Sequence, residues 1–376
     1  MLVLDAESAS DQSAADWSGL QGWLEAAADR LLLPVRTSAF FGFGERILRV
    51  DSDEPELVES VDRAYQDCKL TDRSLSAESP QIHCQVWRVT QSPLVALKFL
   101  TGAPENPAGI ALAFLHPPRN EPPYSITPAT RSGWNLAGAR GKPVLAASDN
   151  IVLFDTTRVL ADFLPDFLVS VALAAQPDLL VVHAASVRIG NSGALLSGRS
   201  HAGKTTTSLH LAARGHSLLG DELAAIRLST GELEHLRRSV RLRPGPRGKS
   251  LLSRLLEVGA FDSSPAHCAG TTQLTIGTLF PAPLPRPAKL RAAFFLQGFS
   301  EHPALEEIQP TLSDSSIFDA LAANDIALVS WGLVPWKRAL RLLALKRLLS
   351  RTRCWKLSVG KPEDTARLIE QTMEAL

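Results

Sequence analysis

The chain has 376 residues, and 45% of them are hydrophobic. At roughly 150 residues per domain this length favours two domains, and the apolar content is enough for two buried cores, which excludes an intrinsically disordered protein. The 39 Lys and Arg residues balance the 39 Asp and Glu residues. The molecule as a whole therefore has no net electrostatic attraction for nucleic acid or for a membrane surface.

The charge is divided unevenly along the chain. Residues 1–165 carry 14 Lys and Arg against 21 Asp and Glu, a net −7, which leaves 25 against 18, a net +7, for residues 166–376. The two halves therefore differ in surface character. We predict an N-terminal α+β accessory domain over residues 1–164 and an α/β domain over residues 165–376.

The cysteines and the apolar segments bear on where the protein works. Cys68, Cys84, Cys268 and Cys354 are widely spaced with no CxxC pair, so neither a disulfide framework nor a zinc site is expected. The longest apolar run, around residues 167–175, falls far short of the ~20 residues that a transmembrane helix needs. The acidic start of the chain does not resemble a secretory signal. We expect a cytoplasmic protein without a transmembrane segment.

The N-terminal half predicts short helices and strands but contains no catalytic motif. A helix is expected from residues 53–55 onward, because proline is well tolerated in the first turn and apolar residues follow at helical spacing. Residues 82–89 and 94–100 are typical of strands, and residues 116–123 form a proline-rich loop. We interpret this half as a scaffold or partner-recognition domain.

The C-terminal half predicts alternating helices and strands. A helix over residues 158–175 leads to an apolar strand over residues 179–189, and the sequence Gly-Asn-Ser-Gly at residues 190–193 predicts a turn into a second strand. These two strands would form a hairpin. Further along we expect a strand over residues 290–296, a basic helix over residues 336–350, a strand over residues 354–359 and a terminal helix opened by Pro362.

A glycine-rich motif follows the expected hairpin. Residues 198–205 match G-x-x-x-x-G-K-[ST], in which backbone amides cradle phosphate oxygens, the lysine reaches the β and γ phosphates, and the hydroxyl binds Mg²⁺. A strand precedes the motif and a helix over residues 204–214 follows it, the context that this motif requires. We therefore predict nucleotide binding. The residues expected to bind the nucleotide are Gly198, Ser200, Ala202, Gly203, Lys204, Thr205 and Thr206.

One loop residue does not suit the conformation that such a loop demands. His201 cannot adopt glycine-like backbone angles cheaply. Its side chain is either a solvent-exposed loop residue or a group near the phosphates, and the sequence leaves both open.

Two adjacent carboxylates follow soon after the loop. Asp221 and Glu222 end a short expected strand over residues 216–220, which places them at the carboxyl end of the next strand along the chain, beside the loop. Carboxylates there can hold Mg²⁺ or accept a proton from an attacking hydroxyl. The alternative is a pair of solvated turn acids. His183 lies alone in an apolar run, and by itself it is more typical of a core histidine.

The run HAASVRIGNSGALLSGRSHAGKTTTSLHLAARGHSLLGDELAAI, residues 183–226, resembles the catalytic core of the HPr kinase/phosphorylase family and its related proteins. That family has a histidine on the strand entering the hairpin, a phosphate loop, a helix ending in Arg-Gly-His and an acidic pair at this spacing. The resemblance covers roughly residues 165–376. It implies an α/β fold with an HPr-kinase/PEP-carboxykinase-like P-loop domain.

The resemblance also implies roles for individual residues. Lys204 and Thr205 would bind ATP or GTP and Mg²⁺, and Asp221 would be the general base for the substrate hydroxyl. Glu222 would be the second metal-linked acid, and His183 would hydrogen-bond near Asp221. The chain departs from the family pattern at two positions. His201 replaces a loop glycine, and Glu222 replaces an aspartate.

Basic residues cluster in two places after the acidic pair. An arginine aimed at the transferring phosphoryl group would stabilise its charge, and we select Arg243 for this role; an exposed charged hairpin is the alternative. The basic helix over residues 336–350 is a packed helix with a solvated face, a docking site for an acidic peptide, or a contact for a membrane or RNA.

Together these features predict a kinase, an ATP-dependent phosphotransferase that moves the γ-phosphate to a hydroxyl. The resemblance implies a serine of a peptide or protein, since related kinases with an extra domain occur in peptide natural-product pathways, including lasso-peptide pathways. Two alternatives stay open: a small-molecule hydroxyl kinase, and a nucleotide-responsive binding protein without catalysis. No nucleic-acid partner is expected, and a homo-oligomer is compatible with the sequence.

Overall fold

The computed structural model describes most of the chain beyond residue 34. The described residues are 35–70, 81–89, 94–104, 107–115, 125–129, 134–139, 142–148, 150–155, 160–242, 251, 253, 255, 266–268, 271–274, 286–311 and 314–376. The chain divides into two compact units. The first comprises residues 1–40, 47–61 and 76–172, and the second comprises residues 41–46, 62–75 and 173–376.

The N-terminal sheet has nine described strands in the order β3-β1-β2-β4-β5-β9-β8-β7-β6. They are β1 (Thr37–Phe43), β2 (Arg46–Ser52), β3 (Lys69–Leu70), β4 (Gln81–Arg88), β5 (Leu94–Thr101), β6 (Ser125–Ala129), β7 (Trp134–Ala139), β8 (Lys142–Ala147) and β9 (Ile151–Asp155). β2 and β4 are parallel because a helical connection separates them along the chain. From β4 to β6 in this order, neighbouring strands are antiparallel.

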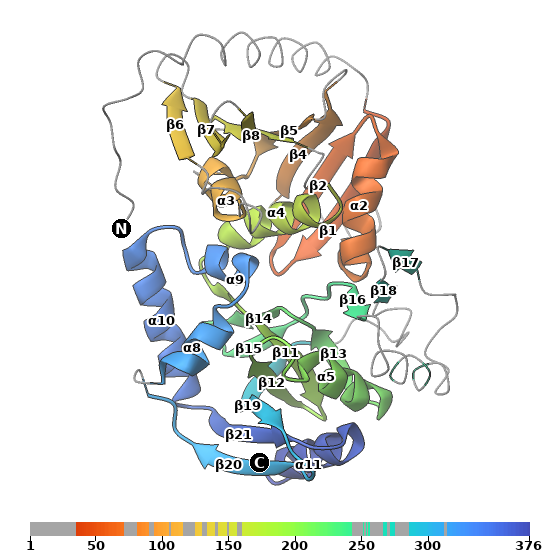
Figure 1. Ribbon diagram of the computed structural model, residues 1–376, viewed down its shortest axis with the longest axis vertical. Helices are drawn as coiled ribbons and strands as arrows, with labels where there is room; N and C mark the ends of the chain where they lie inside the picture. Colours follow the sequence, from red (N-terminus) through yellow and green to blue (C-terminus); the bar gives the residue numbers. More distant parts are fainter. Residues whose placement is uncertain are drawn as a thin grey trace. The chain divides into compact units, whose positions relative to one another are not determined.

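Three α-helices accompany this sheet (Figure 1). They are α2 (Pro55–Tyr65), α3 (Pro107–Ala113) and α4 (Leu160–Ala174), and a short 3-10 turn, η1 (Gln66–Cys68), follows α2. α4 packs on β5 and β9 through aromatic rings: Phe167 makes edge contacts with Phe99 and Phe154, at centroid distances of 6.1 and 5.4 Å. Such pairs stabilise a core beyond the area they bury.

The second unit contains a mixed sheet in the order β10-β14-β15-β19-β12-β11-β13, with β21 beside β19 and β20 beside β21. Its strands are β10 (Leu179–Val182), β11 (Ala184–Ile189), β12 (Ser192–Gly198), β13 (Ser217–Gly220), β14 (Ala224–Arg227), β15 (Glu232–Glu234), β19 (Ala288–Phe299), β20 (Ala304–Ile308) and β21 (Arg353–Val359). β12, β19 and β21 run parallel, so their carboxyl ends meet at one edge. A small separate sheet pairs β16 (Val240–Leu242), β18 (Thr271–Leu274) and β17 (Ala266–Cys268).

Helices cover both faces of this mixed sheet (Figure 1). They are α5 (Lys204–Ala213) and α11 (Pro362–Glu374) on one face, and α8 (Ser315–Leu321), α9 (Asp325–Ser330) and α10 (Pro335–Leu349) on the other. Adjacent residues of β19 serve the two faces: Phe294 belongs to the core under α5 and α11, and Phe295 to the core under α8 and α10. Burial of both faces explains why these strands are apolar at nearly every position.

Most elements expected in the C-terminal half are confirmed. The hairpin pairs Ile189 with Ser192 across its turn, α5 and β13 lie within a residue or two of their expected bounds, and α10, β21 and α11 do the same. The single strand expected over residues 179–189 is wrong. It breaks at His183, because β10 pairs with β14 whereas β11 pairs with β12 and β13. β20, α8 and α9 were not anticipated.

No helix among the described residues combines the length and the hydrophobicity needed to cross a membrane.

The Arg-Gly-His sequence at the end of α5 ties this helix to α11. Arg214 donates two hydrogen bonds to Glu370, of 2.7 and 2.6 Å, and Nε2 of His216 lies 2.7 Å from the same carboxylate. The hydrogen bond from Arg214, with that from His216, lowers the pKa of Glu370 below its ordinary value. Gly215 between them has φ 96°, which lets the chain turn back toward the carboxylate.

Replacing Glu370 tests this connection. Glu370→Gln should reduce the free energy of unfolding by about 1 kcal/mol at neutral pH, because it removes a partly exposed, bidentate ion pair. A carboxyl group with a lowered pKa stabilises the fold only above that pKa, so the difference from the wild type should disappear as the pH falls through it. Urea unfolding measures both. The exposed Glu374→Gln on the same helix is the control, and an equal loss there would contradict the prediction.

Candidate functional site

The phosphate-loop motif spans the junction between β12 and α5. Glycine is required at its two glycine positions for different reasons. Gly203 has φ 100°, a left-handed conformation that side-chain-bearing residues rarely adopt. Gly198 ends β12, and a Cβ there would lie 2.9 Å from the carbonyl oxygen of Leu296 on the neighbouring β19. The loop can therefore turn tightly into the helix while lying directly against β19.

Lys204 reaches back across the loop instead of pointing into solvent. Its Nζ donates to the carbonyl oxygens of Gly198, at 2.7 Å, and Arg199, at 3.3 Å. The residue is 7% exposed, and burial lowers the pKa of its ammonium group, although the charges of Asp221 and Glu222 oppose that shift. A buried ammonium encircled by loop backbone is a strong attractor for an anion.

Two residues other than glycine have a positive φ within the described residues, and both lie in this region. His201 has φ 67° and Glu222 has φ 64°. A left-handed conformation costs a residue with a side chain about 1 kcal/mol or more. Thus His201 does adopt the angles that its chemistry disfavours, and strain of this kind is typical of binding and catalytic sites.

Asp221 is the buried acid of the site. It follows β13 directly and is 4% exposed. Its Oδ2 accepts a 2.8 Å hydrogen bond from Thr205 Oγ1, and its Oδ1 accepts a 3.4 Å bond from Ser208 Oγ. These bonds join the end of β13 to the first turns of α5, so the acid lies beside the loop as the spacing predicted.

The environment of Asp221 changes its acidity. Burial, followed by the negative charge of Glu222, raises the pKa of its carboxyl group from 3.8 to about 6. The hydrogen bonds from Thr205 and Ser208 and the charge of Lys204 act in the opposite direction without reversing the shift. An acid with this pKa is mostly ionised near pH 7 and is close to the value that suits a general base there.

Glu222 forms an ion pair with Arg238, a residue that the sequence did not single out. Its Oε2 lies 3.4 Å from Nη1 of Arg238, whose side chain is only 8% exposed. Arg243, which was selected to stabilise the phosphoryl group, lies outside the described residues. Arg238 belongs to the same arginine-rich segment, yet nothing in the local pattern distinguished it from its neighbours.

His183 occupies the break between β10 and β11. Its backbone N–H donates to the carbonyl of Leu321 at 2.6 Å, and its carbonyl accepts from Ser197 Oγ at 3.3 Å. Its buried Nδ1 has no hydrogen-bond partner among the described residues, so this atom does not make the bond near Asp221 that the resemblance implies. Burial, then the charge of Lys204, lowers the pKa of the imidazole to about 4. The ring is therefore neutral at pH 7.

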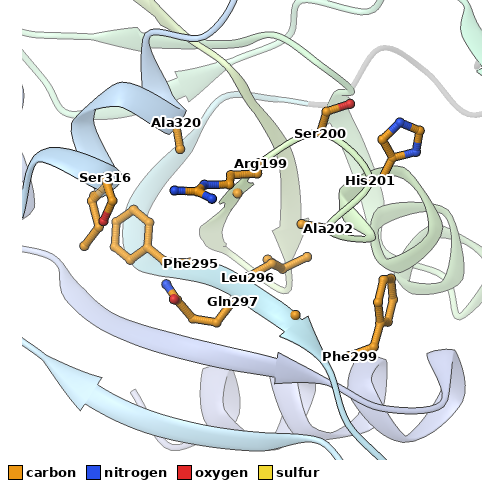
Figure 2. Close-up of a pocket in the computed structure, with 13 residues that line it drawn as sticks. Arg199, Ser200, His201, Ala202, Phe295, Leu296, Gln297, Phe299, Ser316 and Ala320 are labelled. Carbon is orange, nitrogen blue, oxygen red and sulfur yellow. The ribbon is translucent and has the colours of Figure 1, made fainter.

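A cavity of about 440 Å³ opens beside the loop. Residues 198–202 of the loop form one wall, residues 295–299 at the carboxyl end of β19 form another, and α8 contributes Ser316, Ile317 and Ala320 (Figure 2). The side chain of Arg199 extends into this space in Figure 2. No sequence motif could have predicted the cavity, because its walls come from three distant parts of the chain.

The oxygen atoms at the site suit Mg²⁺. No group of three or more His, Cys, Asp and Glu side chains converges anywhere in the described ranges. Mg²⁺ is usually bound by one or two carboxylates, with substrate phosphates and water completing its shell. The adjacent oxygens of Thr205 and Asp221, with Glu222 next in the chain, fit such a site.

Comparisons with known proteins give little beyond this geometry. No protein-family model and no curated protein matches the chain. Among solved structures, the Hpr(Ser) kinase/phosphatase from Coxiella burnetii is similar over 52% of this chain and 94% of its own, with 12% sequence identity and a TM-score of 0.26. A likeness with so low a TM-score assigns neither a fold nor an activity. What the chain does therefore rests on its own residues.

The buried charge of Asp221 yields a stability prediction for the free protein. Because its pKa is higher in the folded state, the folded protein binds more protons between pH 3.8 and about 6, and stability falls as the pH rises through that window. Asp221→Asn lacks this penalty. Its free energy of unfolding at neutral pH should therefore exceed that of the wild type by about 3 kcal/mol. It should accordingly unfold at a higher denaturant concentration.

Chemical denaturation across pH measures this effect. The advantage of Asp221→Asn should shrink as the pH falls from about 6 toward 3.8. The exposed Asp319→Asn serves as the matched control, and it should leave stability unchanged at every pH. A less stable Asp221→Asn at neutral pH would contradict the prediction.

Proposed function

We propose that this protein is a nucleotide-dependent phosphotransferase that moves the γ-phosphate of ATP or GTP to a hydroxyl group, that of a serine in a peptide or protein. One observation carries the proposal: the hydroxyl of Thr205, in the phosphate loop, is hydrogen-bonded at 2.8 Å to the buried carboxylate of Asp221. A loop that binds phosphate and an acid that can accept a proton thus share one site.

The loop residues would hold the donor. Backbone amides of residues 198–203 and the ammonium of Lys204 would bind the phosphates, and Lys204 would exchange its loop carbonyl partners for phosphate oxygens. Thr205, Asp221 and Glu222 would hold Mg²⁺. The ion would neutralise negative charge that develops during transfer.

Asp221 would act on the acceptor. An ionised carboxylate with a pKa of about 6 can take the proton from a hydroxyl as its oxygen attacks the γ-phosphorus. The bond between that phosphorus and the bridging oxygen breaks at the same time, which leaves the nucleoside diphosphate. Neutral His183 would add no positive charge that competes with Lys204, and it supports the site through its backbone contact with Leu321.

A peptide acceptor is favoured by the surface of α10. Trp336, Leu340 and Leu343 are between 54% and 62% exposed on this helix, and Lys337 and Arg338 are exposed beside them. An apolar and basic helix face suits an acidic peptide with apolar anchors. The resemblance of residues 183–226 to the HPr kinase/phosphorylase family also supports a serine acceptor.

Two substitutions separate binding from transfer. Asp221→Asn should keep nucleotide binding and lose transfer by about 100-fold or more, because the proton acceptor is gone. Lys204→Ala should weaken both. Calorimetry with MgATP measures binding, and mass spectrometry of a candidate serine peptide measures the phosphate increment.

The candidate peptide would be a short precursor encoded beside the gene. Trp336→Ala is the control for the nucleotide step, since it lies on the exposed face of α10 and should leave MgATP binding unchanged. Full transfer by Asp221→Asn would refute the base assignment. A wild-type protein that binds MgATP but phosphorylates no acceptor would favour a nucleotide-responsive binding protein.

A further inference from the structure

The cavity beside the phosphate loop has the dimensions of a small-molecule site. Its volume of about 440 Å³ lies within the usual range of roughly 300 to 1,000 Å³ for such pockets. Because residues 198–202 form one of its walls, a molecule held by the loop can extend into the cavity without leaving the protein surface.

The cavity and the acidic pair lie on different sides of the loop. β12, which carries the loop, has β19 on one side and β11 followed by β13 on the other. The carboxyl end of β19 lines the cavity, whereas Asp221 and Glu222 follow β13 and do not line it. A donor whose reacting phosphate faces Asp221 would therefore have its unreactive end on the side of β19.

The lining suits a ring with polar edges. Phe299 is 56% exposed, unusually high for an aromatic side chain at the end of a central strand, and its ring lies beside the loop in Figure 2. A Cβ on Gly203 would lie 3.6 Å from Phe299 Cε1, so the ring is next to the start of α5. Gln297 adds an amide that both donates and accepts hydrogen bonds.

Arg199 supplies a positive charge to the same space. Its side chain extends into the cavity (Figure 2). Within the described part of the chain, its guanidinium has no ion-pair partner. A guanidinium next to a phosphate-binding loop is well suited to an anionic group such as the phosphate that joins a nucleoside to its phosphate chain.

We propose that this cavity binds the nucleoside of the phosphoryl donor. The base stacks on Phe299, Gln297 hydrogen-bonds to its edge, and Arg199 contacts the phosphate nearest the ribose. The inference rests on the proposed function, because it assumes that the loop holds a nucleotide. It adds a specific claim: the protein recognises a nucleoside, and not merely a chain of phosphates.

Comparing MgATP with magnesium tripolyphosphate tests that claim, since tripolyphosphate has the phosphates without the nucleoside. The wild-type protein should bind MgATP at least 10-fold more tightly. Phe299→Leu should weaken MgATP binding roughly 10-fold, the scale of base stacking on an aromatic ring, and leave tripolyphosphate binding unchanged. Phe299→Trp keeps an aromatic face and should retain MgATP affinity. Gln297→Ala should act like Phe299→Leu.

The outcomes distinguish this inference from the proposed function. Equal affinity of the wild type for the two ligands, or an equal loss of both in Phe299→Leu, would overturn the nucleoside site and leave the phosphate loop intact. A change confined to the KM of the acceptor would also overturn it, because the cavity would then bind the acceptor. A wild-type protein that binds neither ligand would refute the proposed function itself. Thermal unfolding checks that each variant is folded.

Discussion

The hydrogen bond between Thr205 and the buried carboxylate of Asp221 is the constraint on which the site depends. It joins the first turn of α5 to the end of β13, so the loop and the acid cannot move independently. Burying an ionisable group is unfavourable unless other groups compensate, and here the compensation is partial, since the pKa of Asp221 remains raised. The fold thus retains an acid in a place where stability alone would not favour one, which is typical of sites selected for chemistry.

Further unfavourable features gather around the same bond. His201 and Glu222 have left-handed backbones. Lys204 is buried and His183 is half-buried, and the pKa values of both side chains are lowered. The second unit can tolerate them because the surrounding sheet is covered on both faces by helices with large apolar cores. These unfavourable features mark the site as clearly as the glycine-rich motif does.

The parts of the site that the sequence predicted are those encoded locally. The loop needs glycine at fixed spacing, and Asp221 follows it after one helix and one short strand, which leaves little freedom in where the acid lies. The missed parts depend on distant pairings. The break at His183 arises because β10 and β11 take different partners, and the cavity needs β19 and α8. β20 is a short strand with mostly exposed side chains, and α8 and α9 span only 7 and 6 residues, too few for periodicity to stand out.

The parallel pairing of β12 with β19 has a consequence for how the protein folds. The loop strand leaves the ribosome long before β19, and β21 follows later still. Until β19 is made, β12 lacks one of its two neighbours, and Gly198 has no strand to lie against. Pairings between such distant segments form slowly, because a long connection must close first. The candidate site is therefore completed late in synthesis, although its motif lies near the middle of the chain.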